Sequence, residues 1–364
     1  MDRRWPGLCV VGRCIVRVLL VAGLLASFAG LAAAQTGAAP TGNAPTATAP
    51  TGVPADPRGS SLTLQFDNDE FAGVNKWDRW YTQAFRIHHF AAAGHDSLAD
   101  QAARLWCAWQ PCAAGALVTR RWSLGQNTYT QNLRNLPVVD VNDRPTAGWL
   151  YASGAMLLES GNETRMVELQ LGVIGPASGA EHLQNQWHRL LGANRVRGWS
   201  SQLRPHAGVQ LQLVQERRYP MIGDRVDLIG RASLSVGSVS GQAAVGAVLR
   251  IGDRLSGTAT AAEAQAATGR IASGGLWSVQ AGLNVRAVAY DRLVDGPTFG
   301  YDTQVRHAPW VGEMQLGATL SPTADWHLRF ALIRRTIDFD SIAVAQGRFK
   351  PQTFGVVQVS MPLR

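Results

Sequence analysis

The feature that most constrains the fold is a repeated alternation of apolar and polar residues along the chain. Residues 167–173 alternate Val, Leu, Leu and Val with Glu, Gln and Gly, and the stretches 62–66, 209–213, 279–287 and 326–332 alternate in the same way. Successive side chains of a strand point to opposite faces of its sheet. Each stretch therefore predicts a β-strand with one apolar face and one polar face.

The length of these strands favours a membrane β-barrel over a soluble β-sandwich. From Ser61 onward no stretch approaches 18 consecutive apolar residues, so membrane-spanning helices are excluded there. The alternating segments approach the roughly 9–11 residues that a tilted transmembrane strand needs. Only 16% of the residues are charged, against about 25% in soluble domains. Several of the twelve Trp residues fall near expected strand ends, as in interfacial girdles: Trp77, Trp80, Trp122, Trp149, Trp277 and Trp326.

The beginning of the chain reads as a segment for export. Four arginines precede an apolar run that ends in Ala32-Ala33-Ala34, so residues 1–34 are predicted to be a cleaved signal peptide. Its removal lowers the net charge from +8 to +5, and no basic run with interleaved aromatic residues follows, so we expect no nucleic-acid partner. Residues 35–60 are rich in Ala, Thr, Pro and Gly and predict a flexible linker. Residues 61–364 are then the predicted membrane β-barrel domain.

Two cysteines remain after the predicted signal peptide. Cys107 and Cys112 lie in the sequence C-A-W-Q-P-C, without His or a second Cys pair at zinc spacing nearby. An exported protein meets oxidising conditions, so a disulfide is favoured.

One segment breaks the strand pattern. Residues 176–192 predict a helix, with Ser178 and Glu181 spaced as a capping box and Gly192 as a stop signal. Four-residue spacing places Gln184 and His188 side by side on this helix, away from its apolar stripe. This polar pair is a candidate site for chemistry.

Two polar clusters flank the first two strands. Residues 67–70 read Asp-Asn-Asp-Glu, and residues 78–82 read Asp-Arg-Trp-Tyr-Thr. Carboxylate and amide oxygens suit a hard cation such as Ca²⁺. Solvated turns are also rich in Asp and Asn, and the order of an EF-hand loop is missing, so spacing alone leaves both interpretations open.

Seven short blocks give the chain a family resemblance. It resembles the outer-membrane lipid A 3'-O-deacylases of the LpxR type over about residues 62–202. In chain order the blocks are D-N-D-E-F, W-D-R-W-Y-T, G-Q-N-T-Y-T, N-D-R-P-T-A-G-W-L, E-L-Q-L-G-V-I-G-P-A-S-G, Q-N-Q-W-H-R-L-L-G and G-W-S-S-Q-L.

The resemblance implies a fold, an activity and a site. It implies an all-β fold, a transmembrane antiparallel β-barrel of about 12 strands with a short helix in an extracellular loop. The implied activity is Ca²⁺-dependent hydrolysis of the ester that holds the 3'-linked acyloxyacyl chain of lipid A. The family's water-activating histidine falls on His188, and its other catalytic positions fall on Asn68, Asp69, Thr82 and Gln184. Asn68 and Asp69 are the implied Ca²⁺ ligands.

The chain departs from the family in ways that bear on activity. The family's acidic residue six positions after the histidine is Asn194 here, so either another acid such as Glu181 or Asp143 takes its place, or this member is slower or inactive. The family's basic side chain has Arg134 as its best match. Lipid A is bis-phosphorylated and Arg pairs well with phosphate, so Arg134 and Arg144 are candidate substrate contacts, with Arg79 and Arg189 as further candidates.

Two other functions remain open from the sequence. One is a barrel without enzymatic activity, such as a porin or an adhesin. The other is a barrel esterase that acts on a different lipid. For the favoured function we expect a monomer in the outer membrane, whose partner is lipid A, or lipopolysaccharide, of the outer leaflet.

Overall fold

The computed structural model describes the following residues: 59–72, 79–93, 97–109, 112, 115–132, 140–256, 275–296, 304–323 and 326–363. Within these residues, no helix is long and apolar enough to cross a membrane. The predicted signal peptide and nearly all of the predicted linker lie outside the described residues, as do Trp77 and Arg134.

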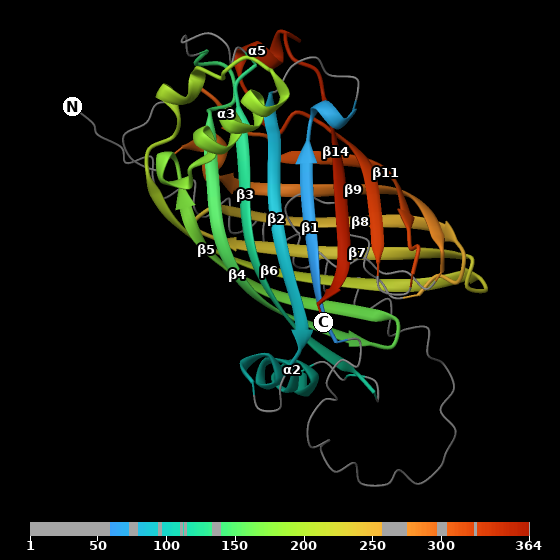
Figure 1. Cartoon of the computed structure of the whole chain (residues 1–364). Coiled ribbons are helices and arrows are strands. Elements are labelled where there is room, and N and C mark those ends of the chain that lie inside the picture. The colour runs from blue at the N-terminus through green and yellow to red at the C-terminus, as the bar shows by residue number, and fades with distance from the viewer. Residues whose placement is uncertain are drawn as a thin grey trace, which may run out of the picture.

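Twelve of the described strands form a closed antiparallel barrel, which confirms the predicted fold class (Figure 1). Around the barrel the order is β1-β14-β12-β11-β9-β8-β7-β6-β5-β4-β3-β2. The strands are β1 (Ser60–Asn68), β2 (Trp80–Ala92), β3 (Leu117–Thr130), β4 (Ala147–Ser160), β5 (Glu163–Ile174), β6 (His206–Ile222), β7 (Val226–Gly237), β8 (Ser240–Gly252), β9 (Trp277–Asp291), β11 (Trp310–Leu320), β12 (His327–Arg335) and β14 (Gln352–Leu363).

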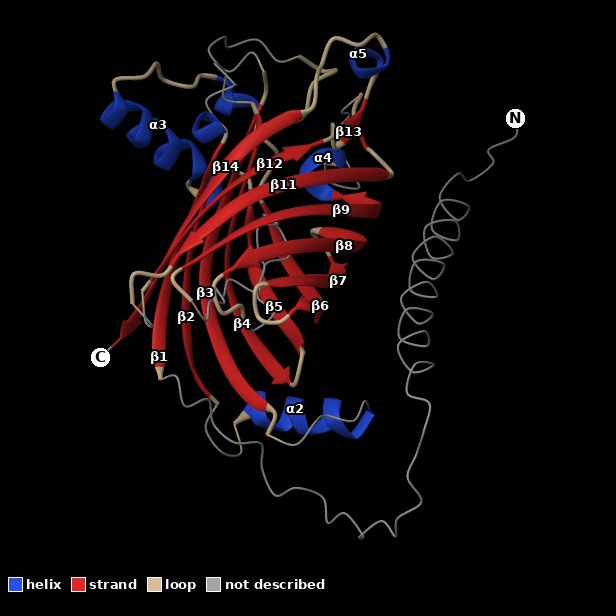
Figure 2. Cartoon of the chain, turned by 90° about the vertical axis from the view of Figure 1, so that its right-hand side faces the viewer, coloured by secondary structure: helices blue, strands red, loops and turns tan. Residues whose placement is uncertain are grey.

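Helices lie at both ends of the barrel (Figures 1 and 2). The end that carries α3 is called the α3 end below, and the opposite end, where the β2–β3 connection forms α2, is called the α2 end. The α-helices are α2 (Leu98–Trp109), α3 (Ala180–Leu191), α4 (Arg292–Asp295) and α5 (Ile342–Ala345), and the 3₁₀ turns are η1 (Glu70–Ala72), η2 (Pro176–Ser178) and η3 (Gly198–Ser201). A two-stranded sheet pairs β10 (Arg306–His307) with β13 (Phe339–Asp340).

The predicted alternation decides which side chains face the membrane. On β5, Leu169 and Leu171 are 46% and 54% exposed, whereas Glu168 and Gln170 are buried. Leucines therefore point out of the barrel wall and polar side chains point into the lumen, as expected for a barrel in lipid.

The lumen of the barrel holds buried charged groups that pair across strands. Asp227 accepts hydrogen bonds from Arg218 (2.6 Å) and from Arg250 (2.7 Å), and Glu313 lies 2.6 Å from Arg335 and 3.1 Å from Arg286. All six side chains are at most 14% exposed. Buried charges need such partners because burial removes their hydration.

The tryptophan girdle is confirmed only in part. Trp122, Trp277 and Trp326 are 61%, 46% and 47% exposed, as a side chain at the membrane interface requires. Trp80 and Trp149 are buried, at 1% and 3% exposed, so their assignment to the girdle was wrong. Trp80 packs edge-on against Phe339 and Phe349, and Trp149 stacks on Tyr151.

The predicted disulfide between Cys107 and Cys112 is present at the end of α2. The predicted helix is also present, and Gly192 ends it with a positive φ of 69° that favours glycine. The predicted capping box was wrong: the N-cap is Gly179 with no side-chain cap, because Ser178 belongs to η2, which precedes the helix.

Candidate active site

Helix α3 packs against the outer face of the barrel wall. At its beginning, Gln126 of β3 donates a hydrogen bond to the carbonyl oxygen of Ser178 (2.6 Å). Gly148 of β4 lies beneath this turn, where a Cβ atom would overlap Ser178 Oγ and the Cβ of Ala180. The absence of a side chain at Gly148 therefore allows the helix to approach the wall closely.

The other end of α3 reaches β1. The ring of Trp187 packs edge-on against Phe66, with 5.1 Å between ring centroids. Phe66 belongs to the alternating series of β1 whose side chains leave the lumen, and Asn68 follows it by two residues, so Asn68 points to the same outer face. The helix thus crosses the wall from β4 to β1.

The strand register indicates that α3 brings His188 close to Asn68 of β1. Asn68 pairs with Gln83 on β2, Gln83 with Thr128 on β3, and Thr128 with Gly148 on β4. Three steps between strands span about 14 Å, and the eight residues from Ala180 to His188 rise about 12 Å along a helix. A helix that starts over Gly148 therefore carries His188 toward Asn68.

The polar pair on α3 faces the barrel. Gln184 is fully buried and His188 is 5% exposed, whereas Leu183 and Leu190 are 41% and 75% exposed. A surface helix of a soluble protein shows the reverse pattern. The burial of polar groups against the wall makes this pair a candidate site, because apolar packing would cost less there.

A backbone carbonyl orients the imidazole of His188. Its Nδ1 lies 2.6 Å from the carbonyl oxygen of Asn194. A carbonyl oxygen only accepts hydrogen bonds, so Nδ1 is the protonated nitrogen and Nε2 is the basic one. The side chain of Asn194 is exposed and takes no part in this bond.

Trp199 fixes the amide of Gln184. Its indole Nε1 donates to Gln184 Oε1 (2.9 Å), and this contact identifies which amide atom is the oxygen. Gln184 Nε2 is buried and has no hydrogen-bond partner among the residues that the structure describes. Gln184 therefore presents an N–H donor next to the histidine. The sequence analysis did not single out Trp199, although it lies in the G-W-S-S-Q-L block.

Asn68, Asp69 and Thr82 lie together where β1 and β2 meet. Asp69 N donates to the carbonyl oxygen of Thr82 (3.1 Å), and Asn68 Oδ1 accepts from Glu70 N (2.7 Å). Thr82 sits at a bulge in β2, where the register shifts, and its hydroxyl lies 2.6 Å from that of Thr130. The structure thus gathers three of the sequence-predicted site residues at the α3 end.

The oxygen atoms at this corner match the chemistry of a hard cation. Asp69 supplies a carboxylate, and its Oδ2 accepts a hydrogen bond from Arg79 N (2.9 Å). The described residues contain no group of three or more His, Cys, Asp or Glu side chains that could hold a metal. A Ca²⁺ ion bound here would therefore depend on neutral oxygens and water in addition to Asp69.

The arginines named as phosphate contacts have different surroundings. Arg144 is fully buried, forms an ion pair with Asp338 (2.5 Å) and stacks over Tyr129, so part of its guanidinium is engaged within the fold, and its contact with a substrate stays a prediction. Burial lowers the pKa of Arg79 from its ordinary value, although nearby Asp143 and Asp69 act in the opposite direction. Arg189 is exposed on α3.

Both candidate substitutes for the missing acid, Asp143 and Glu181, are paired with groups other than His188. Asp143 is held by Trp80 Nε1 (2.8 Å) and by the backbone N–H of Asn132 (2.7 Å), and burial raises the pKa of its carboxyl. Glu181 lies 3.4 Å from Arg195. Both acids therefore have partners elsewhere.

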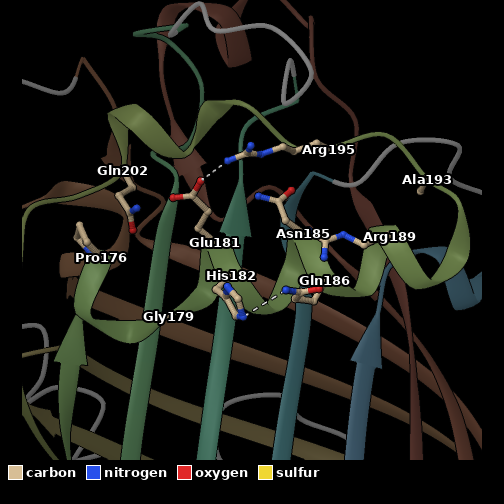
Figure 3. Close-up of a pocket in the computed structure, with 10 residues that line it drawn as sticks. All are labelled: Pro176, Gly179, Glu181, His182, Asn185, Gln186, Arg189, Ala193, Arg195 and Gln202. Atoms are coloured by element: carbon tan, nitrogen blue, oxygen red, sulfur yellow. Dashed lines mark hydrogen bonds and ion pairs between the residues drawn. The ribbon is translucent and has the colours of Figure 1, made fainter.

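A cavity of about 560 Å³ lies beside α3, between the helix and the segment that follows it (Figure 3). Most of the residues that line it have polar side chains, among them Glu181, His182, Arg189 and Arg195. Gln184 and His188 are not among the lining residues. The cavity is therefore adjacent to the polar pair but distinct from it.

Comparisons with known proteins agree with this fold. The family model described as outer membrane protein LpxR matches residues 19–362. LpxR from Salmonella typhimurium superposes with a TM-score of 0.65 and 18% identity, over 83% of this chain and 100% of that one.

Other barrels are more distant. The β-domain of the Bordetella autotransporter BrkA gives a TM-score of 0.41 and 11% identity, over 84% of this chain and 99% of that one. An outer membrane channel from Pseudomonas putida F1 gives 0.39 and 11%, over 86% and 99%. No match was found among curated protein sequences. Because the family model covers most of its length, the chain belongs to the LpxR family of outer membrane proteins.

Proposed function

We propose that the protein is an outer-membrane lipid A 3'-O-deacylase in which His188 activates water. The observation that carries this proposal is the position of the polar pair of α3, which is buried against the outer face of the barrel wall. A substrate that reaches this face comes from the membrane. A lipid ester fits that approach, and the family membership points to lipid A.

The orientation of His188 supports its role as a general base. With Nδ1 bonded to the Asn194 carbonyl, Nε2 takes a proton from water as the water oxygen bonds to the ester carbon. The tetrahedral intermediate then expels the sugar 3'-alkoxide, which takes the proton back from the imidazolium. The products are a free acyloxyacyl acid and a sugar hydroxyl, and no covalent enzyme intermediate forms.

The remaining residues have roles that follow from their contacts. Gln184 Nε2, fixed by Trp199, donates to the developing oxyanion. The Thr82 hydroxyl donates to the carbonyl oxygen of Trp80 (3.4 Å), so Thr130 donates to Thr82 (2.6 Å), and these two bonds fix the Thr82 oxygen at the site.

Asp69 and Asn68 would hold Ca²⁺. A bound Ca²⁺ ion would supply positive charge for the ester oxygen. Since the described site offers few carboxylates, we expect weak Ca²⁺ binding, with a dissociation constant of about 10⁻⁴–10⁻³ M.

We also propose that the α3 end faces the cell exterior. This end carries the more elaborate connections, which in bacterial barrels are extracellular. The site then lies at the outer leaflet, where lipid A resides. The orientation and the export signal are tested together by labelling of surface residues on intact cells.

Mass spectrometry of lipid A tests the activity. Lipid A is extracted from cells that express wild type, His188→Gln or His182→Gln, each with and without a Ca²⁺ chelator. His182 is the matched control, because it lies on the same helix but is exposed. We expect loss of the 3' acyloxyacyl chain for wild type and His182→Gln with Ca²⁺ present, and intact lipid A for His188→Gln.

The controls separate the other functions. A heat-modifiable gel shift first verifies that each barrel is folded. Unchanged lipid A from folded, surface-exposed wild type would refute the proposed function. Lysophospholipid in place of deacylated lipid A would indicate an esterase for a different lipid.

A further inference from the structure

Helix α2 packs on the membrane-facing side of the barrel wall. Its Ala103 is fully buried in a cluster with Val118 of β3 and with Met156 and Leu158 of β4. Val118 alternates with the lumenal Thr119 and Arg121, and Met156 and Leu158 alternate with the lumenal Ala155 and Leu157, so these side chains point out of the barrel. The helix therefore covers a part of the wall that would otherwise face lipid.

The neighbouring residues place α2 at the edge of the apolar belt. On β3 the outward residues that follow Val118 are Arg120, Trp122 and Leu124, and Trp122 and Leu124 are 61% and 51% exposed. An exposed Trp beside an Arg is typical of the boundary between acyl chains and headgroups. Helix α2 lies just beyond this boundary and crosswise to β2 and β3 (Figure 2).

The side of α2 that faces away from the wall is apolar. Leu98, Leu105 and Trp109 are 84%, 74% and 81% exposed. Their spacings of seven and four residues place them on one stripe of a helix with 3.6 residues per turn. Soluble surfaces rarely expose three large apolar side chains together.

The polar residues of α2 lie off this stripe: Asp100 is buried on the side of Ala103, and Gln101 and Arg104 lie between that side and the apolar stripe. Arg104 forms an ion pair with Asp100 one turn earlier (3.0 Å). Gln101 and Ala108 are exposed beside this pair. The helix thus has one side for the wall, one apolar side and one polar side, as expected for a helix in the membrane interface.

The disulfide fixes the end of this helix to the wall. Cys107 and Cys112 pack partly buried against the same cluster, and Arg165 of β5 donates to Cys112 Sγ (3.7 Å). Trp109 lies inside the short loop that the disulfide closes. The bond therefore limits how far the apolar stripe can move from the wall.

We propose that α2 is an interfacial helix that inserts Leu98, Leu105 and Trp109 into the leaflet at the α2 end. In the orientation proposed above this is the phospholipid leaflet on the periplasmic side. The occupant of the apolar stripe is lipid, because the stripe continues the exposed belt of β3 at the same edge. The inference depends on the barrel being in a membrane, and it is independent of the deacylase activity.

A spin-label scan along α2 tests this proposal. Single cysteines are introduced into the chain that begins after the predicted signal peptide, at six positions: Leu98, Gln101, Arg104, Leu105, Ala108 and Trp109. Each variant is labelled with a nitroxide in vesicles of phosphatidylethanolamine and phosphatidylglycerol. Collision rates with oxygen and with a water-soluble nickel complex are then compared. Retention of the Cys107–Cys112 disulfide and of the heat-modifiable gel shift verifies the fold at each position.

We expect a helical periodicity with opposite phases for the two reagents. Labels at 98, 105 and 109 collide mostly with oxygen, and those at 101, 104 and 108 collide mostly with the nickel complex. The ratio of the oxygen collision rate to the nickel collision rate differs at least threefold between the two sets. Equal access to the nickel complex at all six positions would place the helix in water and overturn the proposal. Labels at 98, 105 and 109 that neither reagent reaches would indicate a protein partner and would also overturn it.

Discussion

Changing Trp199 to Phe separates the placement of Gln184 from the chemistry of His188. The indole Nε1 of Trp199 donates to Gln184 Oε1 at 2.9 Å, and the ring is 2% exposed. Phe retains most of the packing but removes the donor. Gln184 then has a buried oxygen without its partner, and its amide is free to reverse. A hydrogen bond of this kind contributes about 1–2 kcal/mol, so the rate of deacylation should fall about 5–30-fold.

The assay measures release of the acyloxyacyl acid from lipid A by purified barrel in mixed micelles with Ca²⁺. His188→Gln should lower the rate far more, by about 10²–10⁴-fold. Trp187→Phe is the matched control, because the new ring still packs on Phe66, and its rate should stay within about twofold of wild type, since no polar contact is lost.

A double-mutant cycle decides whether Trp199 acts through Gln184. In the Gln184→Ala background, Trp199→Phe should have no further effect on the rate, since the partner is already absent. If Trp199→Phe lowers the rate by the same factor in both backgrounds, Trp199 acts through packing and the assigned role of Gln184 is refuted.

Three further predictions concern the histidine, the lumen and the loops at the α3 end. Asn194→Ala should keep deacylation within about threefold of wild type, because the backbone carbonyl orients His188; a loss above tenfold in the same assay would show that the side chain is needed. Asp227→Asn should lower the free energy of unfolding by about 3–5 kcal/mol, because it weakens the partner of two buried arginines; the urea midpoint of the gel shift measures this, and an unchanged midpoint would contradict it. Burial disfavours the charged form of His307, but the bond to Asp295 outweighs it and raises the pKa of His307. The pair therefore stabilises the fold fully below the ordinary His pKa of about 6.5 and loses this effect as pH rises through the folded value. The urea midpoints of wild type and His307→Gln should differ most in mildly acidic solution and converge in alkaline solution, and a constant difference would exclude this pair as the cause.

Periodicity predicted the parts of the fold that depend on local sequence. The alternation on β5 gave the correct lumenal and outer faces, because the pleat of a strand fixes the two sides whatever its neighbours are. Gly192 correctly marked the end of α3, since its positive φ is a local requirement.

The features that depend on barrel closure could not be read from the sequence. Arg144 was a candidate for phosphate, but its partner Asp338 lies 194 residues further along the chain. Trp149 lies near a predicted strand end, as a girdle tryptophan would, but its place in the alternation of β4 points its side chain into the lumen. Sequence spacing gives no measure of such distant contacts.

The side of the wall on which the site lies argues against a porin. A channel requires water in the lumen, but Arg121, Glu168, Asp227 and Arg329 are at most 3% exposed, so these lumenal charges meet protein groups in place of water. The polar groups of α3, in contrast, lie outside the wall, where a porin has no use for them. Burying the imidazole of His188 on the outer side of the wall, with its Nδ1 bonded to a backbone carbonyl, costs free energy, and a purely structural wall gains nothing from it. Such a cost is expected where the imidazole meets a lipid substrate.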